Sequence, residues 1–321
     1  SNSRKDAKIV RTNASMMPAR HNDKESMLGG FGEADADNSY TSSQTVAQCN
    51  QMVRMGFIRK VYGILSIQLL ATAIMCAMAM KMTAAEKVGE WTVLSFGSIL
   101  ASSSALRICI FIFSIGILIA LFFLKNKYPA NMALLSVWTI AMSLSVATSC
   151  TYAMCDPMVS VPTGPGKSFV FEPYSVAKAN GAKSFQLYKG AMTCAIGTAK
   201  ADQGSDAVVM ATLITAIIFF SLTAFTLQSK IDFSFLGAGL FVCTMVLCLF
   251  GFGMMLFGAT ANLYYGYCVA GAIIFSLYIV FDTYMIHNKM GPDDYILASI
   301  ELYLDIINLF IFILQLLNRR D

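Results

Sequence analysis

Long runs of uncharged, mostly apolar residues recur along the chain after residue 60. A membrane-spanning helix needs about 20 such residues, and ordinary surface helices carry a polar face. The runs predict spans at residues 61–80, 108–124, 130–153 and 207–229, and a mostly apolar stretch that contains two acids predicts a further span at residues 295–318. The start of the second span stays open, because residues 91–106 are also uncharged but rich in serine.

The uncharged run at residues 233–281 is about twice as long as one crossing requires. We divide it at residues 258–263, where glycine and asparagine gather, into a fifth and a sixth span. The predicted fold class is therefore an all-α integral membrane protein with a seven-transmembrane-helix bundle over residues 57–318. Residues 1–56 are expected to be a disordered cytoplasmic tail, and residues 156–206 and 287–294 are expected to be polar loops.

Composition supports this class and excludes others. Hydrophobic residues make up 56% of the 321 residues and charged residues only 13%, about half the share in a typical soluble protein. The net charge of +4 is small and scattered, so we expect no nucleic-acid partner. The chain has two histidines and no nucleophile–base pair in the spans, so we expect neither an enzyme nor a tightly bound cofactor.

Basic residues in short loops predict the orientation of the bundle. They fall on one side of the predicted membrane: Arg54, Arg59, Lys60, Lys125, Lys127, Lys230 and Lys289. Because such residues mark the cytoplasmic side, we expect the N-terminus inside and the 156–206 loop in the lumen or outside. Arg319 and Arg320 disagree with an outside C-terminus, so whether the last span crosses completely stays open.

Eight of the nine cysteines lie in the predicted spans, in the 156–206 loop or beside it, and they divide into two groups. Most of those in the spans are expected to be small packing residues, namely Cys76, Cys109, Cys243, Cys248 and Cys268. Cys155 and Cys194 bracket the 156–206 loop and are the candidate disulfide pair, with Cys150 close enough to compete.

Three acidic residues interrupt the last two predicted spans. Asp282 lies near the end of the sixth, and Glu301 and Asp305 lie in the seventh, followed by Asn308. Glu301, Asp305 and Asn308 are four and three residues apart, so they share one helical face. Ionisable side chains are costly against lipid. The stripe therefore predicts that the seventh helix lies at the centre of the bundle, with this face toward the interior.

These acids have no lysine or arginine deep in a span to neutralise them. Two carboxyl groups in a low-dielectric interior cannot both ionise cheaply and therefore share a proton. Such a pair is a pH-responsive latch, and its oxygens suit a hard cation such as Ca²⁺. The alternative interpretation is that the acids only hold helices together.

Four sequence blocks carry a resemblance to a known family. They are Phe57-Ile58-Arg59-Lys60-Val61-Tyr62 continuing to Gln68-Leu69, Lys230-Ile231-Asp232-Phe233, Phe281-Asp282-Thr283, and Asp294-Tyr295-Ile296 followed by Leu302-Tyr303-Leu304-Asp305-Ile306-Ile307-Asn308. In this order they resemble the Bax-inhibitor-motif family, also called lifeguard or transmembrane Bax inhibitor motif-containing proteins. The resemblance covers residues 57–317 outside the 156–206 loop.

The resemblance implies a seven-helix fold with a central last helix. It also implies a pH-sensitive Ca²⁺ leak across an intracellular membrane, in the endoplasmic reticulum or Golgi with the plasma membrane as an alternative, and suppression of cell death. The family's gating pair corresponds to Asp282 and Asp305, which would bind calcium transiently as the permeant ion. In relatives a basic residue after the second span ties down the closed state. Lys125 and Lys127 are available here, and lysine lacks the bidentate fork of arginine.

Two features depart from the family pattern. Relatives normally have a short turn where this chain carries residues 156–206, and Glu301 stands where they usually carry a small or amide residue. The main functional alternative to a leak channel is a non-transporting membrane protein that regulates cell death by binding partners. A seven-helix receptor would need the N-terminus outside, which the basic residues argue against. The expected partners are membrane lipid, calcium ion and cell-death regulatory proteins.

Overall fold

The computed structural model describes the chain over residues 45–49, 51–81, 85–88, 91–94, 104–124, 127–162, 169–180, 186–187, 194–196, 199–258 and 260–318. Contacts divide the chain into one unit at residues 1–39 and another at residues 40–321, and all the described residues belong to the second. The predicted disorder of residues 1–44 and the predicted role of Lys125 therefore concern parts of the chain outside this description.

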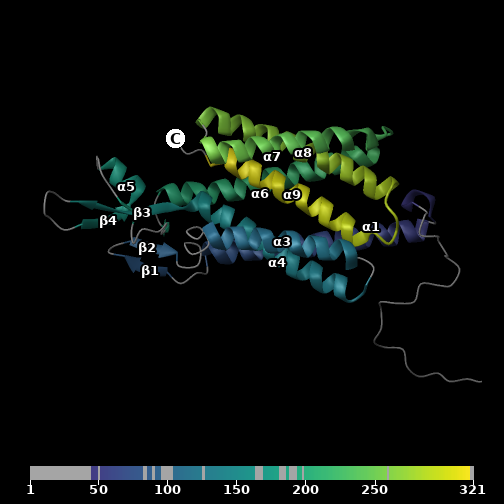
Figure 1. Cartoon of the computed structure of the whole chain (residues 1–321), viewed down its shortest axis with the longest axis horizontal. Helices are drawn as coiled ribbons and strands as arrows, with labels where there is room; N and C mark the ends of the chain where they lie inside the picture. The colour runs from purple at the N-terminus through teal and green to yellow at the C-terminus, as the bar shows by residue number, and fades with distance from the viewer. Residues whose placement is uncertain are drawn as a thin grey trace, which may run out of the picture. The chain divides into compact units, whose positions relative to one another are not determined.

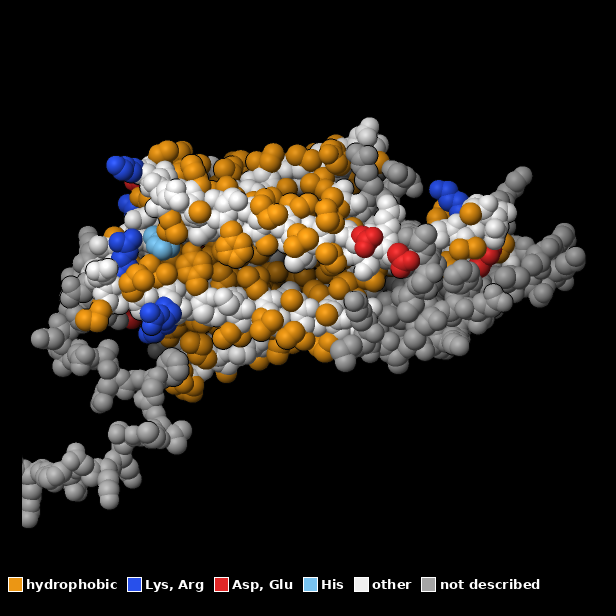
Figure 2. Space-filling view, turned by 180° about the vertical axis from the view of Figure 1, so that it is seen from behind, with side chains coloured by type: hydrophobic (Ala, Val, Ile, Leu, Met, Phe, Trp, Pro, Cys, Tyr) orange, Lys and Arg blue, Asp and Glu red, His pale blue; other side chains and the backbone are white. Residues whose placement is uncertain are grey.

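Seven helices in the described part are long and apolar enough to cross a membrane. They are α1 (Gln51–Lys81), α3 (Ser104–Leu124), α4 (Ala130–Met154), α6 (Ala199–Gln228), α7 (Leu236–Phe257), α8 (Ala261–Asn288) and α9 (Tyr295–Leu317). Exposed phenylalanine, isoleucine and leucine side chains cover the outside of the bundle, as a lipid-facing surface requires (Figure 2). The predicted seven-helix membrane fold is confirmed.

The last helix, α9, lies at the centre of this bundle. It packs against α1, α4, α6 and α8, while α3 packs on α4 and α7 packs on α8 (Figure 1). In α9, 72% of the most apolar stretch is buried, against at most 50% in any other spanning helix of the described chain. The prediction of a central seventh helix from its polar stripe is therefore confirmed.

The long uncharged run at residues 233–281 breaks where glycine and asparagine gather. Helix α7 ends at Phe257, and Gly258 follows with φ +76°, a backbone conformation that glycine adopts without a steric penalty. The Thr260 hydroxyl oxygen accepts a hydrogen bond from the Leu263 N–H at 3.4 Å and caps the start of α8. The predicted division of this run into two spans is thus confirmed.

The predicted tail is wrong at its C-terminal boundary. Helix α1 begins at Gln51, before the expected end of the tail at residue 56. The short helix η1 (Val46–Gln48) precedes it, and Val46 is fully buried and donates its N–H to the Met290 carbonyl at 2.9 Å. The apolar pattern could not show this, because the contact joins the N-terminal segment to the distant turn between α8 and α9.

Two predicted loops also begin or end elsewhere. Helix α8 continues to Asn288, so His287 is helical rather than part of the 287–294 loop. Helix α6 begins at Ala199, inside the predicted 156–206 loop. In both cases the helix extends beyond its apolar run into polar sequence, where its termini are no longer under the constraint of the hydrocarbon layer.

The 156–206 segment contains strands that the sequence did not indicate. Strand β3 (Asp156–Pro162) pairs antiparallel with β4 (Phe169–Pro173), β5 (Gln186–Leu187) and β6 (Cys194–Ile196), and the short helix α5 (Tyr174–Ala179) follows β4. Strand β2 (Trp91–Leu94) pairs with β6 and with β1 (Ala85–Val88). The described strands form a sheet in the order β1-β2-β6-β3-β4, with β5 on β3.

The two ends of the bundle differ in charge. Figure 2 shows lysine and arginine side chains gathered at one end of the bundle, which we call the basic end. The described basic residues at the helix ends and turns on this side are Arg54, Arg59, Lys60, Lys127, Lys230 and Lys289. The sheet marks the opposite end, since β3 directly follows α4 and β6 directly precedes α6 (Figure 1). Helix α9 is continuous, and Asn318 lines the same cavity as Ala153 at the sheet end. The last span therefore crosses the bundle completely.

Candidate functional site

The two aspartates predicted to form a pair are neighbours in the structure. Asp282 on α8 is 7% exposed and Asp305 on α9 is 4% exposed. Their carboxyl groups are hydrogen-bond partners. Oδ2 of Asp305 is buried and has no N–H or hydroxyl donor among the described residues. A hydrogen bond between two carboxyl groups needs a proton on one of them, so the two groups lie close enough to share a proton, and that they do so stays a prediction.

Close packing of α8 against α9 holds this pair in place. Gly271 on α8 faces the ring of Phe312 on α9, and a Cβ at this glycine would lie 2.5 Å from the ring carbons. The pair itself lies toward the basic end: Asp282 is about 9 Å along the axis from the end of α8. Both aspartates face the interior of the bundle because α9 is surrounded by other helices, as the polar stripe predicted.

The other two residues of the predicted stripe differ in their surroundings. Glu301 is half-buried one turn before Asp305 and interacts electrostatically with Asp282, Asp294 and Asp305. Asn308 is also half-buried, but its side-chain amide donates to the Leu304 carbonyl of its own helix at 2.8 Å. Glu301 therefore lies within electrostatic range of the aspartate pair, whereas the described bond of Asn308 is local.

The predicted basic latch is only partly described. Lys127 is exposed on the turn between α3 and α4, and its backbone bonds to Leu124 and Asn131. It lies at the basic end, the same end as the aspartate pair. Lys125 lies outside the described residues, so the latch stays a prediction.

A buried polar ladder, which the sequence patterns did not predict, joins α1, α4 and α9. Gln68 Nε2 donates to the Thr139 hydroxyl at 3.2 Å. One helical turn further along both helices, the hydroxyls of Thr72 and Ser143 lie 3.0 Å apart. Thr72 also bonds the hydroxyl of Tyr303 at 2.8 Å. The signal in the sequence was the shared spacing of four residues between polar positions in two uncharged spans.

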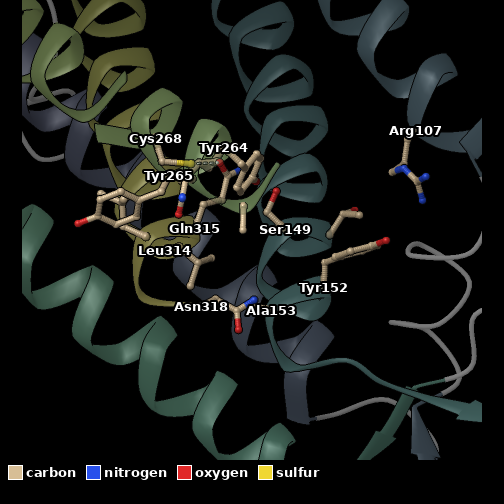
Figure 3. Close-up of a pocket in the computed structure, with 15 residues that line it drawn as sticks. Arg107, Ser149, Tyr152, Ala153, Tyr264, Tyr265, Cys268, Leu314, Gln315 and Asn318 are labelled. Carbon is tan, nitrogen blue, oxygen red and sulfur yellow. Dashed lines mark hydrogen bonds between the residues drawn. The ribbon is translucent and has the colours of Figure 1, made fainter. Parts of the chain in front are cut away.

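A cavity of about 840 Å³ opens among α3, α4, α8 and α9 at the sheet end (Figure 3). Polar and aromatic side chains line it, among them Arg107, Ser149, Tyr264, Gln315 and Asn318. Gln315 accepts a hydrogen bond from the Cys268 thiol at 3.4 Å, drawn as a dashed line in Figure 3. The cavity and the aspartate pair therefore lie toward opposite ends of the same two helices, α8 and α9.

The cysteine prediction is tested for one partner. Cys155 is disulfide-bonded, whereas the competitor Cys150 is free and donates to the Cys76 sulfur at 3.9 Å. The backbone register of β3 and β6 places Cys194 opposite Pro157, two residues from Cys155. The side chain of Cys194 lies outside the described part of the chain, so the Cys155–Cys194 pairing stays a prediction.

The oxygen ligands near the pair are few. No group of three or more histidine, cysteine, aspartate or glutamate side chains in the described chain could hold a metal ion. Ca²⁺ usually takes six to eight oxygen ligands, so transient calcium binding by the two carboxyl groups stays a prediction.

The fold and this pair define a class of protein: a multi-pass α-helical membrane bundle with two hydrogen-bonded carboxyl groups in its core. The family described as inhibitor of apoptosis-promoting Bax1 matches residues 54–163 and 181–321, and the chain belongs to it. The match is interrupted at residues 164–180, which lie within the 156–206 segment, and the interpretation of that segment as an insertion stays a prediction.

Relatives from mammals, viruses and fungi are similar over most of their length. Mouse protein lifeguard 4 is 28% identical over 90% of this chain and 95% of its own. The Golgi anti-apoptotic protein of vaccinia virus strain Lister is 32% identical over 91% of this chain and 96% of its own. Bax inhibitor 1 of Schizosaccharomyces pombe is 28% identical over 89% and 85%. Their names support a role of this chain in suppressing cell death.

Proposed function

We propose that the chain is a pH-sensitive calcium leak channel of an intracellular membrane, and that it suppresses cell death by adjusting stored calcium. The hydrogen-bonded pair Asp282–Asp305, buried between α8 and the central helix α9, carries this proposal. The Golgi anti-apoptotic relative supports the Golgi as one location. The basic end is placed in the cytoplasm by the rule that lysine and arginine mark that side, so the N-terminus is cytoplasmic.

The shared proton is the gate in this mechanism. With the proton present, the two carboxyl groups hold α8 and α9 together and carry one negative charge between them. When the proton is lost, two negative charges face each other in a low-dielectric interior. Either α8 and α9 separate or a cation enters between the carboxylates, and both outcomes favour calcium passage.

The cavity at the sheet end supplies the other part of the route. Gln315 in its wall and Asp305 in the pair are about 15 Å apart along the axis of α9. Between them Phe312 packs against Tyr267 and Phe275, with ring centroids 5.5 Å and 5.8 Å away. These rings close the interval while α8 and α9 remain in contact, so an ion passes only when the helices move apart.

Calcium flux from liposomes containing the purified full chain tests the proposal across a series of pH values. The wild type should leak calcium in a pH-dependent way, and Asp282→Asn and Asp305→Asn should each flatten the profile, because an amide cannot lose the proton. Asp206→Asn is the matched control, since Asp206 is exposed at the start of α6.

Two outcomes would reject the leak channel. One is the absence of flux at every pH from protein that elutes as a folded species, and the other is a wild-type profile in both aspartate variants. A non-transporting interaction protein would then be the better description, with the aspartates acting only as a contact between helices.

A further inference from the structure

A second cavity, of about 530 Å³, lies at the basic end, opposite to the sheet-end cavity, and neither aspartate of the pair is among its described lining residues. It is formed by the start of α1, the end of α6 and the end of α8. Its lining residues are Cys49, Gln51, Arg54, Met55, Ile58, Leu227 and His287. We propose that this basic-end pocket binds the phosphate of an anionic phospholipid headgroup, with Arg54 and His287 as its donors. This site does not depend on the proposed channel activity.

The polar side of the pocket is suited to an anion. Arg54 lies within electrostatic range of His287, and no acidic residue is among the described side chains that line the pocket. His287 is 8% exposed, and its Nε2 atom is buried with no hydrogen-bond partner in the described chain. A buried polar atom without a partner is costly, and a neutral imidazole donates from one ring nitrogen. A phosphate oxygen would satisfy that atom while pairing with the guanidinium.

The remaining wall of the pocket is apolar and faces outward. Met55 and Leu227 are each 52% exposed, and Ile58 is half-buried and packs against the bundle core. Inorganic phosphate has no apolar part that could pack against this wall, whereas the glycerol and the first acyl carbons of a phospholipid would cover it. A pocket with a basic floor and an apolar lip at the end of membrane helices therefore favours a lipid over a free ion.

Other basic residues strengthen the attraction of this end for an anionic membrane surface. Arg59, Lys60 and Lys230 are exposed there but do not line the pocket. They contribute a diffuse field, while Arg54 contributes a specific contact. A specific binding site therefore predicts that substitution of Arg54 matters more than substitution of Arg59, Lys60 or Lys230. These three residues serve as matched controls.

Native mass spectrometry of the purified full chain in detergent, titrated with short-chain phosphatidylglycerol, tests the proposal. We expect Arg54→Gln to weaken binding about tenfold and Arg59→Gln by less than about threefold. Leu227→Glu places a carboxylate on the exposed lip and should also weaken binding about tenfold. Short-chain phosphatidylcholine, which is neutral overall, should bind more weakly than phosphatidylglycerol.

Three results would overturn the site. Equal losses in Arg54→Gln and Arg59→Gln would leave only diffuse attraction, and equal affinity for the two lipids would remove the role of headgroup charge. Displacement of phosphatidylglycerol by an equal concentration of inorganic phosphate would assign the pocket to a soluble ion. Unchanged thermal melting of each variant serves as the test of folding.

Discussion

The hydroxyl groups of Thr72 on α1 and Tyr303 on the central helix α9 lie 2.8 Å apart in the buried interior of the bundle. Thr72 also lies 3.0 Å from the Ser143 hydroxyl on α4, so one threonine connects three helices. The ring of Tyr303 meets the ring of Trp138 on α4 edge to face, with centroids 5.5 Å apart. This contact fixes the side of α9 opposite to the one that carries Asp305.

Removing either partner of this contact should destabilise the bundle. We expect Thr72→Val and Tyr303→Phe each to lower the free energy of unfolding by about 0.6–1.5 kcal/mol, the usual size of a hydrogen bond between membrane helices. The double variant should lose less than the sum, because both changes remove the same bond. Denaturant unfolding in detergent micelles measures these values.

Ser66→Ala is the matched control for that series. Ser66 is on the same helix as Thr72, but it is exposed, and among the described residues its hydroxyl bonds only to the Tyr62 carbonyl, at 2.7 Å. We expect a change close to zero. A loss equal to that of Thr72→Val would contradict the view that the bond between helices matters.

The contact of Gly271 with Phe312 makes a second prediction. Gly271→Ala should destabilise the protein by about 1–3 kcal/mol, because the new methyl group meets an aromatic ring in a packed interior. Gly266→Ala on the same helix has open space around it and should be neutral or stabilising through helix propensity. Thermal melting of the two variants measures the difference, and a reversed order would reject the packing described here.

Asp232, in the turn between α6 and α7, gives a pH-dependent prediction outside the membrane-spanning segments. Hydrogen bonds from the Ser234 hydroxyl, the Ser234 N–H and the Tyr284 hydroxyl hold the pKa of Asp232 down to about 2, against 3.8 ordinarily. The N–H bond measures 2.9 Å. Because the folded-state pKa is lowered, the stabilisation is complete above about pH 4 and is lost as pH falls through about 2.

The melting temperature of the wild type should therefore exceed that of Asp232→Asn above pH 4, with the gap closing toward pH 2. In a chain that carries Ser234→Ala, the difference in melting temperature between the form with Asp232 and the form with Asp232→Asn should be smaller but not zero. The backbone N–H of residue 234 still donates to the carboxylate in that chain. A gap that stays constant or widens on acidification would show that the capping carboxylate does not titrate as described.

The disulfide prediction is tested by counting thiols in the denatured, unreduced chain. If Cys155 pairs with Cys194, Cys155→Ser and Cys194→Ser should each label one thiol more than the wild type, because each releases the other partner. Cys150→Ser should label one thiol fewer, since Cys150 is free. If Cys150→Ser instead labels one thiol more than the wild type and Cys194→Ser does not, Cys155 pairs with Cys150 rather than with Cys194.

The aspartate pair shows how far sequence patterns reach in a membrane protein. Asp282 and Asp305 could be predicted to face inward, because a charge against lipid costs too much for any other placement. That they bond to each other depends on how closely α8 and α9 approach. The approach in turn depends on packing such as that of Gly271 against Phe312, which no spacing rule reveals.

Other features depended on contacts between distant segments. Thr72, Ser143 and Tyr303 are common residues in spanning helices, and each pattern alone is compatible with many neighbours. The short strands β2 and β6 lie about 100 residues apart in sequence and are stabilised only by each other and by the rest of the sheet. His287 was placed in a loop because it follows the last apolar run, although α8 continues past it.

The sequence by itself determined the number of spans, the break at Gly258, the central position of α9 and the clustering of basic residues at one end. These features follow from the free-energy cost of placing charges and unpaired backbone groups in hydrocarbon. That cost depends on the chemistry of each residue, so the sequence is enough to predict its effect. Tertiary structure brought the predicted pair Asp282 and Asp305 together, and it alone decided the other contacts: the ladder through Thr72, the sheet, and the pocket of Arg54 and His287. Such contacts depend on the mutual positions of helices, and those positions result from packing across the whole bundle.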